Sequence, residues 1–538
     1  MVILKPFKLI EAGEVRTRFA PSPTGFFHIG SAKTALFNYL FTKQKQGSFV
    51  LRIEDTDPER SKPEFEEDII GSLKWLGIEW TEGPDINDGY GPYRQSQRTK
   101  IYEKYLKKLL AENKAYYCFC SSEELEAKRQ EQMARGEAPK YDGKCASLSA
   151  AQIKKNIEED KKSVIRLRTA EKKVVFKDLI RGEVEFDTKL IGDFVIAKDL
   201  KTPLFYLAGA IDDYEMKISH VIRGEEHISN TPKQILIQEA LGFPRPIYGH
   251  IPLILAQDRS KLSKRHGAVA VVEYKKAGYL PEALVNFLAF LGWNPGTERE
   301  IFSLASLIKE FSLENVQKGG AIFNQKRLDF LNGFYIRQKS IKKLTELCLP
   351  YLMEAKLIEP TNNKIPMAKP SGTLGPDFVE GSRQGRNKIG AKVAKNYKII
   401  ETAEKISLST LEKVIGLYQT RIKKLSEIVE CIDFFFKKDL DYPKKLLVWQ
   451  NMNWSEVLSS LSDLEKILSG IKKQSWNSKN LQNVLLLEAE KMPNRGYLLW
   501  PLRVALTGKE SSAGPFEIAE VLGKEKVLKR IKKAKEKK

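Results

Sequence analysis

Two short segments contain residues that could hold the phosphates of a nucleotide. The first, residues 18–30, is a turn rich in proline and glycine that leads to His28. The second, residues 261–265, reads Lys-Leu-Ser-Lys-Arg and carries three cations. Cationic side chains neutralise phosphate charge and can follow it onto a leaving pyrophosphate. Together the two segments predict a site that grips ATP at its α-phosphate from both sides.

The elements around the first segment are those of an anion site. Residues 15–20 predict a short buried strand, because β-branched and aromatic residues precede the turn. The free N–H groups and positive dipole of a helix N-terminus face a bound anion, and Gly25 and Gly30 let a nucleotide approach the backbone. A helix from His28 onward is predicted by apolar residues at helical spacing, namely Ile29, Ala32, Leu36, Tyr39 and Leu40.

A simpler interpretation exists for each segment taken alone. His28 could do no more than cap a helix, and a cluster of basic residues is most often a solvated loop. The presence of both segments in one chain favours the nucleotide site. The predicted ATP contacts are His28, Gly30, Lys261, Ser263, Lys264 and Arg265.

Further segments predict the rest of a catalytic sheet and its helices. Residues 49–57 read as a second strand that ends in acidic residues, and ligands bind at the carboxyl edge of a doubly wound sheet. Ser61 and Glu64 predict a capping box for the helix that follows. Thr231 is expected to be the N-cap of another helix, with Pro232 at its first position.

Length and charge restrict the class of protein. At 538 residues the chain is too long for one core and should hold several domains. Lys and Arg number 90 against 69 acidic residues, and this formal charge of +21 favours nucleic acid as a partner over a membrane. Solubility alone is the other interpretation of such a charge. Five cysteines, an odd number, and no secretory pattern in residues 1–10 predict a cytoplasmic protein with reduced thiols.

The two nucleotide segments resemble the signatures of class I aminoacyl-tRNA synthetases, in the forms of the glutamyl and glutaminyl branch. Within it, residues 20–25 are similar to the glutamyl enzymes, because glutaminyl enzymes typically carry a carboxylate where Ser22 stands. A site for a side-chain carboxylate should lack an opposing one, since like charges in a dry pocket repel strongly. The resemblance runs from Val15 to Arg337 and resumes near Arg495.

The resemblance also implies roles in an amino-acid site. Glu54 would contact the amino group of bound glutamate, and Arg18 and Arg223 would face its carboxylates, which an arginine fork binds bidentately. The other expected glutamate contacts are Ala20, Ser22 and Tyr206.

The chain departs from the family pattern at two of its substrate contacts. The family commonly has a tyrosine where this chain has Phe205 and an asparagine where it has Gly209. Losing a hydroxyl and an amide would leave the pocket less polar. Either Tyr206 compensates or the pocket is reshaped.

A metal site is expected between the halves of the sheet. Cys118, Cys120 and Cys145 match three zinc ligands of some family members. The usual fourth position is Ser147 here, which zinc rarely accepts, whereas Tyr141 resembles a tyrosine ligand of a related truncated enzyme. Structural zinc is almost always four-coordinate, so these four residues predict a structural Zn²⁺ site. The alternative is a degenerate site with reduced thiols.

The expected fold is a Rossmann-type α/β catalytic domain, a doubly wound parallel sheet, with an α+β insertion and an all-α C-terminal anticodon-binding region. The last segment, residues 524–538, is expected to be a solvated basic helix. The expected boundaries are 1–14 for an N-terminal extension, 15–115 and 206–267 for the two sheet halves, 116–205 for the acceptor-binding insertion, 268–345 for a stem-contact module, and 346–538 for the helical region, with a flexible insert near 359–395.

The resemblance implies a reaction in two steps. Glutamate attacks the α-phosphorus of ATP to give glutamyl-adenylate and pyrophosphate, and the terminal ribose of tRNA(Glu) then takes the glutamyl group. His28, Lys264 and Mg²⁺ would supply positioning and charge neutralisation. The family generally binds tRNA before adenylation, and a monomer in the cytoplasm is expected.

Other functions are compatible with part of this pattern. An enzyme that also charges tRNA(Gln) with glutamate differs only in anticodon contacts, and a glutaminyl enzyme is disfavoured by Ser22 and by the helical C-terminus. An inactive RNA-binding relative need not keep the catalytic His28 and Lys264. A class I nucleotidyltransferase of another pathway would lack the long basic helical region.

Overall fold

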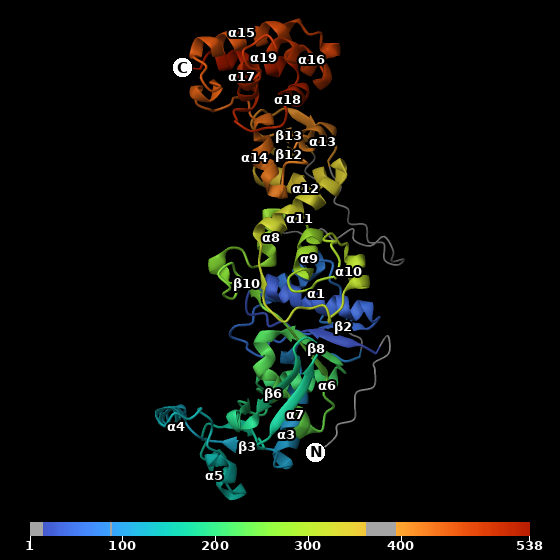
Figure 1. The fold of residues 1–538 in the computed structure, drawn as a ribbon. Helices are drawn as coiled ribbons and strands as arrows, with labels where there is room; N and C mark the ends of the chain where they lie inside the picture. Colours follow the sequence, from blue (N-terminus) through green and yellow to red (C-terminus); the bar gives the residue numbers. More distant parts are fainter. Residues whose placement is uncertain (1–13, 87–88, 362–393, 538) are drawn as a thin grey trace. The chain divides into compact units, whose positions relative to one another are not determined.

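The computed structural model describes residues 14–86, 89–361 and 394–537, and among these it leaves out the side chain of Lys264. The expected N-terminal extension and most of the expected insert near 359–395 therefore lie outside the described residues. The chain divides into two compact units (Figure 1). In the described residues, the first unit holds 14–273 and 284–325, and the second holds 274–283, 326–361 and 394–537.

The first unit is built on a six-stranded sheet whose central strands are parallel. The strand order is β2-β1-β8-β9-β5-β6, and β5 and β6 form an antiparallel hairpin at one edge. Parallel register joins β1 to β2 and to β8, β8 to β9, and β9 to β5. The strands are β1 (Arg16–Phe19), β2 (Ser48–Leu51), β5 (Lys173–Asp178), β6 (Gly182–Asp187), β8 (His220–Gly224) and β9 (Ile247–Ile251).

Helices cover both faces of this sheet, which is the doubly wound arrangement (Figure 1). Helix α1 (Ile29–Gln44) lies against β1, β2 and β8, and Asn38 donates to the carbonyl oxygen of Ile222 at 2.9 Å. The opposite face packs on three helices, α3 (Thr99–Ala111), α6 (Phe205–Glu215) and α7 (Thr231–Leu241). Burial of apolar side chains on both faces explains why the strands read as continuous hydrophobic runs. The sequence-based prediction of a Rossmann-type sheet is confirmed.

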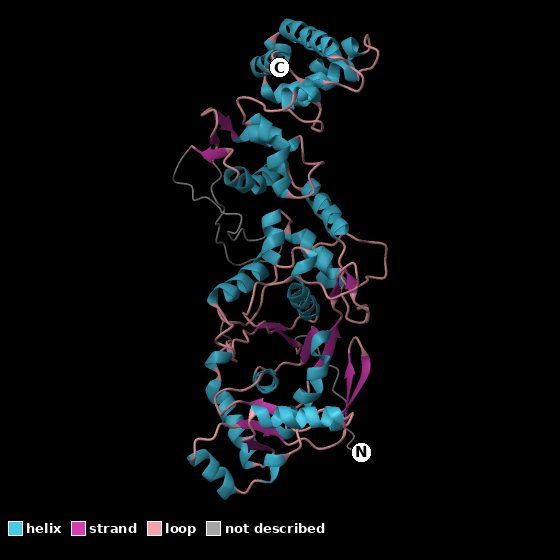
Figure 2. Ribbon diagram, turned by 90° about the vertical axis from the view of Figure 1, so that its left-hand side faces the viewer, coloured by secondary structure: helices cyan, strands magenta, loops and turns pink. Residues whose placement is uncertain are grey.

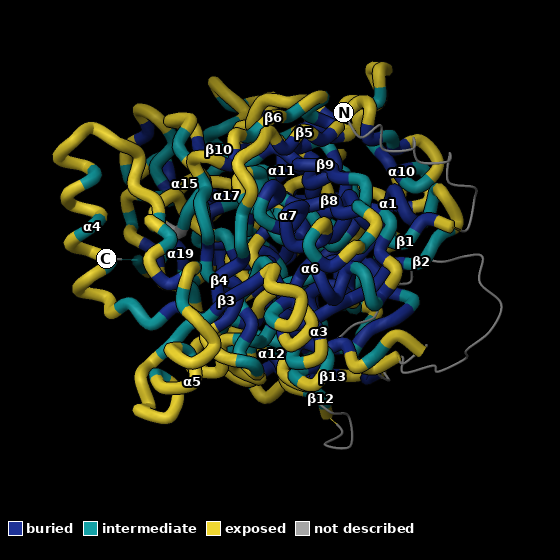
Figure 3. The backbone as a smooth tube through the Cα atoms, turned by 90° about the horizontal axis from the view of Figure 1, so that it is seen from below, coloured by how far each residue is buried: buried dark blue, intermediate teal, exposed yellow. Residues whose placement is uncertain are grey.

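The insertion between the sheet halves is a mixed α+β segment. It contains an antiparallel sheet in the order β3-β4-β7, and two exposed helices (Figure 3). The same stretch of chain also supplies β5 and β6, which extend the main sheet. The elements of the insertion are β3 (Ala115–Cys118), β4 (Val164–Leu167), β7 (Val195–Ala197), α4 (Ser122–Ala134) and α5 (Ala150–Glu158).

Two predicted helix starts differ from the structure. Helix α2 (Pro63–Trp75) begins at Pro63, and its N-cap, Lys62, makes no side-chain cap hydrogen bond. Ser61 therefore forms no capping box; proline already suits the first turn because it lacks the N–H that a cap would satisfy. Helix α7 begins at Thr231 itself, so this residue is not the N-cap.

The second unit is mostly helical, as expected, but it is not all-α. Figure 2 shows short strands among its helices, and these are β12 (Ile358–Pro360), β13 (Asn396–Ile399) and β14 (Lys405–Ser407), paired antiparallel. Tyr397 and Ile399 of β13 enter the core of this unit, which explains why the strands form.

The C-terminal helix α19 (Lys524–Lys535) contradicts the expectation of a solvated basic helix. Val527, Ile531 and Ala534 are fully buried in the core, and Arg530 is buried as well. Lysines at both ends of the segment donate to backbone carbonyls of neighbouring elements. Apolar residues three and four positions apart form the buried face of this helix, although most of its other residues are charged.

The remaining elements complete the description. They are β10 (Ile254–Leu255), β11 (Ala321–Ile322), α8 (Val271–Ala277), α9 (Pro281–Ala289), α10 (Leu304–Glu310), α11 (Gln325–Gln338), α12 (Ile341–Glu354), α13 (Leu408–Gly416), α14 (Ile428–Ile432), α15 (Trp454–Gly470), α16 (Ser478–Ala489), α17 (Gly496–Thr507) and α18 (Pro515–Leu522).

Candidate active site

The carboxyl ends of neighbouring parallel strands bring the predicted amino-acid residues together. Arg18 stands near the end of β1, Glu54 follows β2, and Arg223 lies near the end of β8, opposite His250 of β9. Ligands bind at this edge of a doubly wound sheet because loops and helix N-termini open there. All four side chains are buried, so each must find charge or hydrogen-bond partners.

One buried network joins two of these residues through a residue pair that was not predicted. Asp213 Oδ1 of α6 accepts from Arg18 Nε at 3.0 Å and from Arg52 Nη1 at 2.8 Å. Arg52 Nη2 in turn donates to Glu54 Oε1 at 2.9 Å. Burial would raise the pKa of the Asp213 carboxyl, but Arg18 and Arg52 outweigh burial and hold this pKa below its usual value. Burial raises the pKa of Glu54, although both arginines oppose the shift.

A second network holds Arg223. Its Nη2 donates to Thr231 Oγ1 at 2.7 Å, and its Nε donates to His250 Nε2 at 3.3 Å. Because Nε2 accepts, the His250 proton lies on Nδ1, which is 2.6 Å from Asp178 Oδ2. Burial lowers the pKa of His250, which favours this neutral form. Thr231 thus uses its hydroxyl to position Arg223, where the sequence had suggested a helix cap.

The two networks leave several charged atoms unpaired. Within the described residues, no group accepts from the terminal nitrogens Nη1 and Nη2 of Arg18 or from Nη1 of Arg223, and none donates to Glu54 Oε2. Two cationic donors and one anionic acceptor at one sheet edge suit a zwitterionic ligand that carries an extra carboxylate. This is the pattern that an acidic amino acid would satisfy.

Asp212, the neighbour of Asp213, anchors helix α6 from its other side. It accepts from Arg98 Nε at 2.7 Å, from Tyr102 at 2.8 Å and from Gln95 at 2.8 Å. Two adjacent acids inside an otherwise apolar helix were a usable signal in the sequence, because buried carboxylates need partners. The sequence analysis assigned neither acid a role.

Helix α6 carries both positions at which the chain departs from the family pattern. Phe205, Gly209 and Asp213 are four residues apart and therefore share one face of the helix. The Phe205 ring stacks on His227 with ring centroids 5.5 Å apart. Tyr206 lies off this face: its ring packs against Phe194, and its hydroxyl accepts from Lys233 at 3.4 Å. The described contacts of Tyr206 do not join it to Arg18, Glu54 or Arg223.

The loop of residues 20–25 borders the same edge. Glu54 donates its backbone N–H to the Pro21 carbonyl at 3.0 Å, which ties this loop to the strand end that carries the acidic side chain. Ala20 is partly buried and Ser22 is exposed.

The nucleotide end of the site joins the two predicted segments. His28 is the N-cap of α1, where its Nδ1 accepts from the backbone N–H of Ser31 at 3.2 Å. The strand-like bridge of His28 with Ala270 brings the end of the 261–267 loop against the first segment. Burial lowers the pKa of His28, and Glu226 opposes this shift. Lys261 lowers the pKa further, so its charge lies close enough to repel a protonated His28.

Gly30 and the basic loop show how His28 is positioned. A Cβ atom at Gly30 would lie 3.0 Å from His28 Nδ1, so the absence of a side chain leaves room for the ring. In the loop, Ser263 contacts His266 at 3.1 Å, and Lys261 and Arg265 are exposed. Lys264 begins a short 3-10 helix, Lys264–His266, and the structure describes its backbone but not its side chain.

Lys33, one turn into α1, was missed by the sequence reasoning. It is fully buried, and its Nζ donates to the Pro252 carbonyl at 2.7 Å, just before β10. Burial lowers the pKa of Lys33 to about 7, although Glu225 and Glu226 oppose the shift. This contact connects the helix that starts at His28 to the chain that leads into the basic loop.

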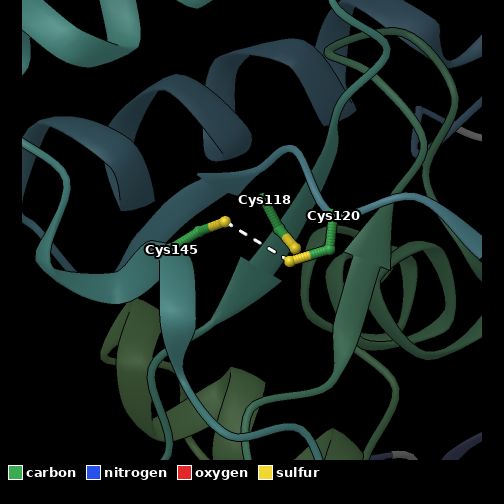
Figure 4. A group of neighbouring side chains, drawn as sticks. All are labelled: Cys118, Cys120 and Cys145. Atoms are coloured by element: carbon green, nitrogen blue, oxygen red, sulfur yellow. Dashed lines mark hydrogen bonds between the residues drawn. The ribbon is translucent and has the colours of Figure 1, made fainter. Parts of the chain in front are cut away.

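The three predicted cysteine ligands gather in the insertion (Figure 4). Cys120 Sγ is 3.6 Å from Cys145 Sγ, and the hydroxyl of Tyr141 is 3.4 Å from Cys118 Sγ and 3.6 Å from Cys120 Sγ. Tetrahedral zinc with bonds of about 2.3 Å places its sulfur ligands about 3.8 Å apart, so this cluster fits the ion. Tyr141, whose hydroxyl lies beside the thiols, is the group that could complete a set of four ligands. The helices of the described residues include none that is long and apolar enough to cross a membrane.

Comparison with known proteins gives a consistent result. Residues 14–330 match the catalytic domain of tRNA synthetases class I (E and Q), and residues 391–535 match an anticodon binding domain. Glutamate–tRNA ligase 1 of Caldicellulosiruptor saccharolyticus is 44% identical over 527 residues, 96% of this chain and 98% of that protein. The glutamate–tRNA ligase of Carboxydothermus hydrogenoformans is 42% identical over 523 residues, 96% and 99% of the two chains. A crystal structure of a glutamate tRNA ligase from Elizabethkingia meningosepticum, in complex with its amino acid, aligns with a TM-score of 0.79 at 31% identity and covers 97% of this chain and 99% of that one.

Proposed function

Because the chain belongs to the glutamate–tRNA ligases of the class I synthetase family, we propose that it ligates L-glutamate to tRNA(Glu) at the expense of ATP. The observation that carries the choice of amino acid is the set of unpaired atoms at the sheet edge. Arg18 and Arg223 offer free guanidinium nitrogens to two carboxylates, and Glu54 offers a free oxygen to an ammonium group.

The first step forms glutamyl-adenylate. An α-carboxylate oxygen of glutamate attacks the α-phosphorus of ATP in line, a phosphorus–oxygen bond forms, and the bond to pyrophosphate breaks. His28 and the N-terminus of α1 stabilise the charge on the α-phosphate, and Lys261 and Lys264 receive that of the pyrophosphate. Mg²⁺ bound with the triphosphate supplies further charge neutralisation.

The second step transfers the glutamyl group. The hydroxyl of the terminal tRNA ribose attacks the activated carbonyl, and AMP leaves with the electrons of the broken bond. The C-terminal match to an anticodon binding domain supports tRNA as the acceptor. An enzyme that also charges tRNA(Gln) with glutamate is the alternative.

Aminoacylation with purified tRNAs tests this function. In the presence of ATP, we expect the enzyme to attach glutamate, and not glutamine, to tRNA(Glu). Arg223→Ala should raise the KM for glutamate about 100-fold, since a buried carboxylate contact is lost. No charging of either tRNA(Glu) or tRNA(Gln) with glutamate by the unaltered enzyme would contradict the proposal, and charging of tRNA(Gln) would select the alternative.

We also propose that Cys118, Cys120, Cys145 and Tyr141 hold a structural zinc ion, which would crosslink β3 to the segment after α4. Metal analysis of the purified enzyme should give one zinc per chain, and Cys120→Ser should abolish it. Ser147→Ala is the matched control and should retain zinc. A zinc-free enzyme that keeps its thermal stability in the presence of a chelator would rule the site out. We further propose that the enzyme is a monomer and works in the cytoplasm. The cysteines of the described residues are all free thiols, which is in keeping with a reducing compartment.

A further inference from the structure

The gap left by Gly209 in helix α6 is occupied by a side chain of the neighbouring helix. A Cβ atom at Gly209 would lie 2.9 Å from Nε2 of Gln234, which belongs to α7. A larger residue at this position would therefore displace the end of the Gln234 side chain. The amide group absent from α6 is replaced in space by one from α7.

Gln234 belongs to one of the two helices that hold the arginine networks, and it meets the other at Gly209. Gln234 follows Thr231 by three residues, so both lie on the face of α7 that reaches Arg223. Gly209 precedes Asp213 by four residues, and Asp213 holds Arg18. The Gln234 amide accordingly lies where α7, which holds Arg223, packs against α6, which holds Arg18.

The Gln234 amide has no protein partner in the part of the chain that the structure describes. The side chain is 98% buried, with 2% of its surface exposed, yet none of the described residues donates to it or accepts from it. Buried amides are nearly always hydrogen-bonded. The next buried glutamine of α7, Gln238, follows this rule, because its Oε1 accepts from Tyr248 at 3.2 Å. A donor without a protein partner, on the same helix face as the Thr231 that holds Arg223, indicates a place for an anionic group of a ligand.

We propose that Gln234 Nε2 donates a hydrogen bond to a carboxylate oxygen of bound glutamate and so helps to determine the specificity of the amino-acid site. This inference rests on the proposed function of the same site. A carboxamide has two N–H donors, and one of them can meet the ligand while the side chain stays packed against Gly209. Gln234 contributes to ground-state binding, so its loss should raise KM more than it lowers kcat.

Steady-state aminoacylation of tRNA(Glu) by the full-length enzyme tests the proposal. Gln234→Leu keeps most of the volume and removes the amide. We expect the KM for glutamate to rise about tenfold or more, with kcat, the KM for ATP and the KM for tRNA within about twofold. Gln238→Leu is the matched control from the same helix; it should lower the melting temperature and leave the KM for glutamate within about twofold.

Two further variants separate binding from packing. Gln234→Glu has the same size but would face a carboxylate with a like charge, so its KM for glutamate should exceed that of Gln234→Leu. Gly209→Asn alone should bind glutamate poorly because it displaces the end of the Gln234 side chain, and Gly209→Asn with Gln234→Ala should bind it better than Gln234→Ala alone, since the amide returns from α6.

Several results would overturn the inference. One is an unchanged KM for glutamate in Gln234→Leu; another is a KM lowered by Gln234→Glu, which would place the ammonium group there. If the leucine variant does not fold, the glutamate variant supplies the same readout. Failure of the unaltered enzyme to charge any tRNA would instead reject the proposed function, and the two failures are thus distinguishable.

Discussion

Single residues in the amino-acid site are arranged by the hydrogen bonds that they share. Asp213 accepts from both Arg18 and Arg52, and Arg52 also holds Glu54, so one buried pair orients an anion-binding and a cation-binding group together. Fixed side chains pay their ordering entropy during folding, which leaves more of the interaction energy for the substrate. Removing Asp213 would free two buried arginines and disturb both ends of the expected ligand.

Gly30 makes a testable contribution at this scale. Gly30→Ala should lower kcat about tenfold or more, because the new methyl group would lie 3.0 Å from His28 Nδ1 and displace the ring by tenths of an ångström. Single-turnover adenylate formation would measure the loss. Gly71→Ala, whose Cβ would meet no atom within 4 Å, is the control and should behave like the unaltered enzyme. Equal rates for both variants would remove the glycine from this role.

His220 should couple stability to pH. It is buried against Phe41, and burial, with a smaller effect of Lys45, lowers its pKa to about 4. An unfolded histidine has a pKa of about 6.5, so between these values the unfolded chain binds more protons and stability falls as the pH falls. This histidine alone should account for about 2 kcal/mol at pH ~5.

The variant His220→Phe checks the sign and size of this effect. Melting temperatures measured from pH 7 to pH 5 should fall less steeply for the variant than for the unaltered protein, because the proton uptake on unfolding is removed. His266→Phe, at an exposed position, is the control and should keep the original slope. Parallel slopes for His220→Phe and the unaltered protein would contradict the depressed pKa.

At the scale of elements, the N-terminus of α1 and the paired helices α6 and α7 position the chemistry. Helix α1 brings His28 to one side of the sheet edge, and α6 and α7 bring Asp213, Thr231 and Gln234 to the other. The helical periodicity of these segments was predictable, but the caps of α2 and α7 were not. Capping signals are local and weak, and a tertiary partner such as Arg223 can recruit the hydroxyl that a cap would use.

Arg530 of α19 provides a prediction about an element. Its guanidinium donates to the carbonyl oxygens of Leu506, Phe434 and Lys437, and burial lowers its pKa to about 10. Arg530→Ala should destabilise the second unit by about 3 kcal/mol, since two buried carbonyls and a partly buried one lose their donor. The urea midpoint, followed by circular dichroism, measures the change.

The exposed neighbour Lys529 supplies the control for this experiment. Lys529→Ala should change the free energy of unfolding by no more than about 0.5 kcal/mol, because surface substitutions away from special contacts have small effects. If Arg530→Ala were as mild as Lys529→Ala, the helix would be held by its apolar face alone and the carbonyl contacts would contribute little.

At the scale of the whole molecule, the chain combines a catalytic unit with a mostly helical unit and carries a formal charge of +21. Such an excess of positive charge favours association with a polyanion through release of its counterions. Part of this charge is used within the protein, because Lys524, Lys526 and Lys537 of the C-terminal segment donate to backbone carbonyls.

Salt dependence tests this electrostatic contribution. Between about 50 and about 200 mM salt, the KM for tRNA should rise about tenfold or more, as roughly three phosphate contacts would require. The KM for glutamate should change far less, because its partners are buried in the site and poorly screened. A KM for tRNA that is independent of salt would show that phosphate contacts do not dominate binding.

The sequence by itself determined the nucleotide segments, the strand–turn–helix that precedes His28, the central sheet and the gathering of Cys118, Cys120, Tyr141 and Cys145. Most of these features depend on turns, periodicity and residue types that act over short stretches of chain. The tertiary structure alone decided which buried charges pair, that Thr231 serves Arg223, that α19 has a buried face, and that Gln234 fills the space beside Gly209. Those outcomes depend on which faces of distant segments pack together, and burial then forces each polar group to find a partner that its neighbours in sequence cannot provide.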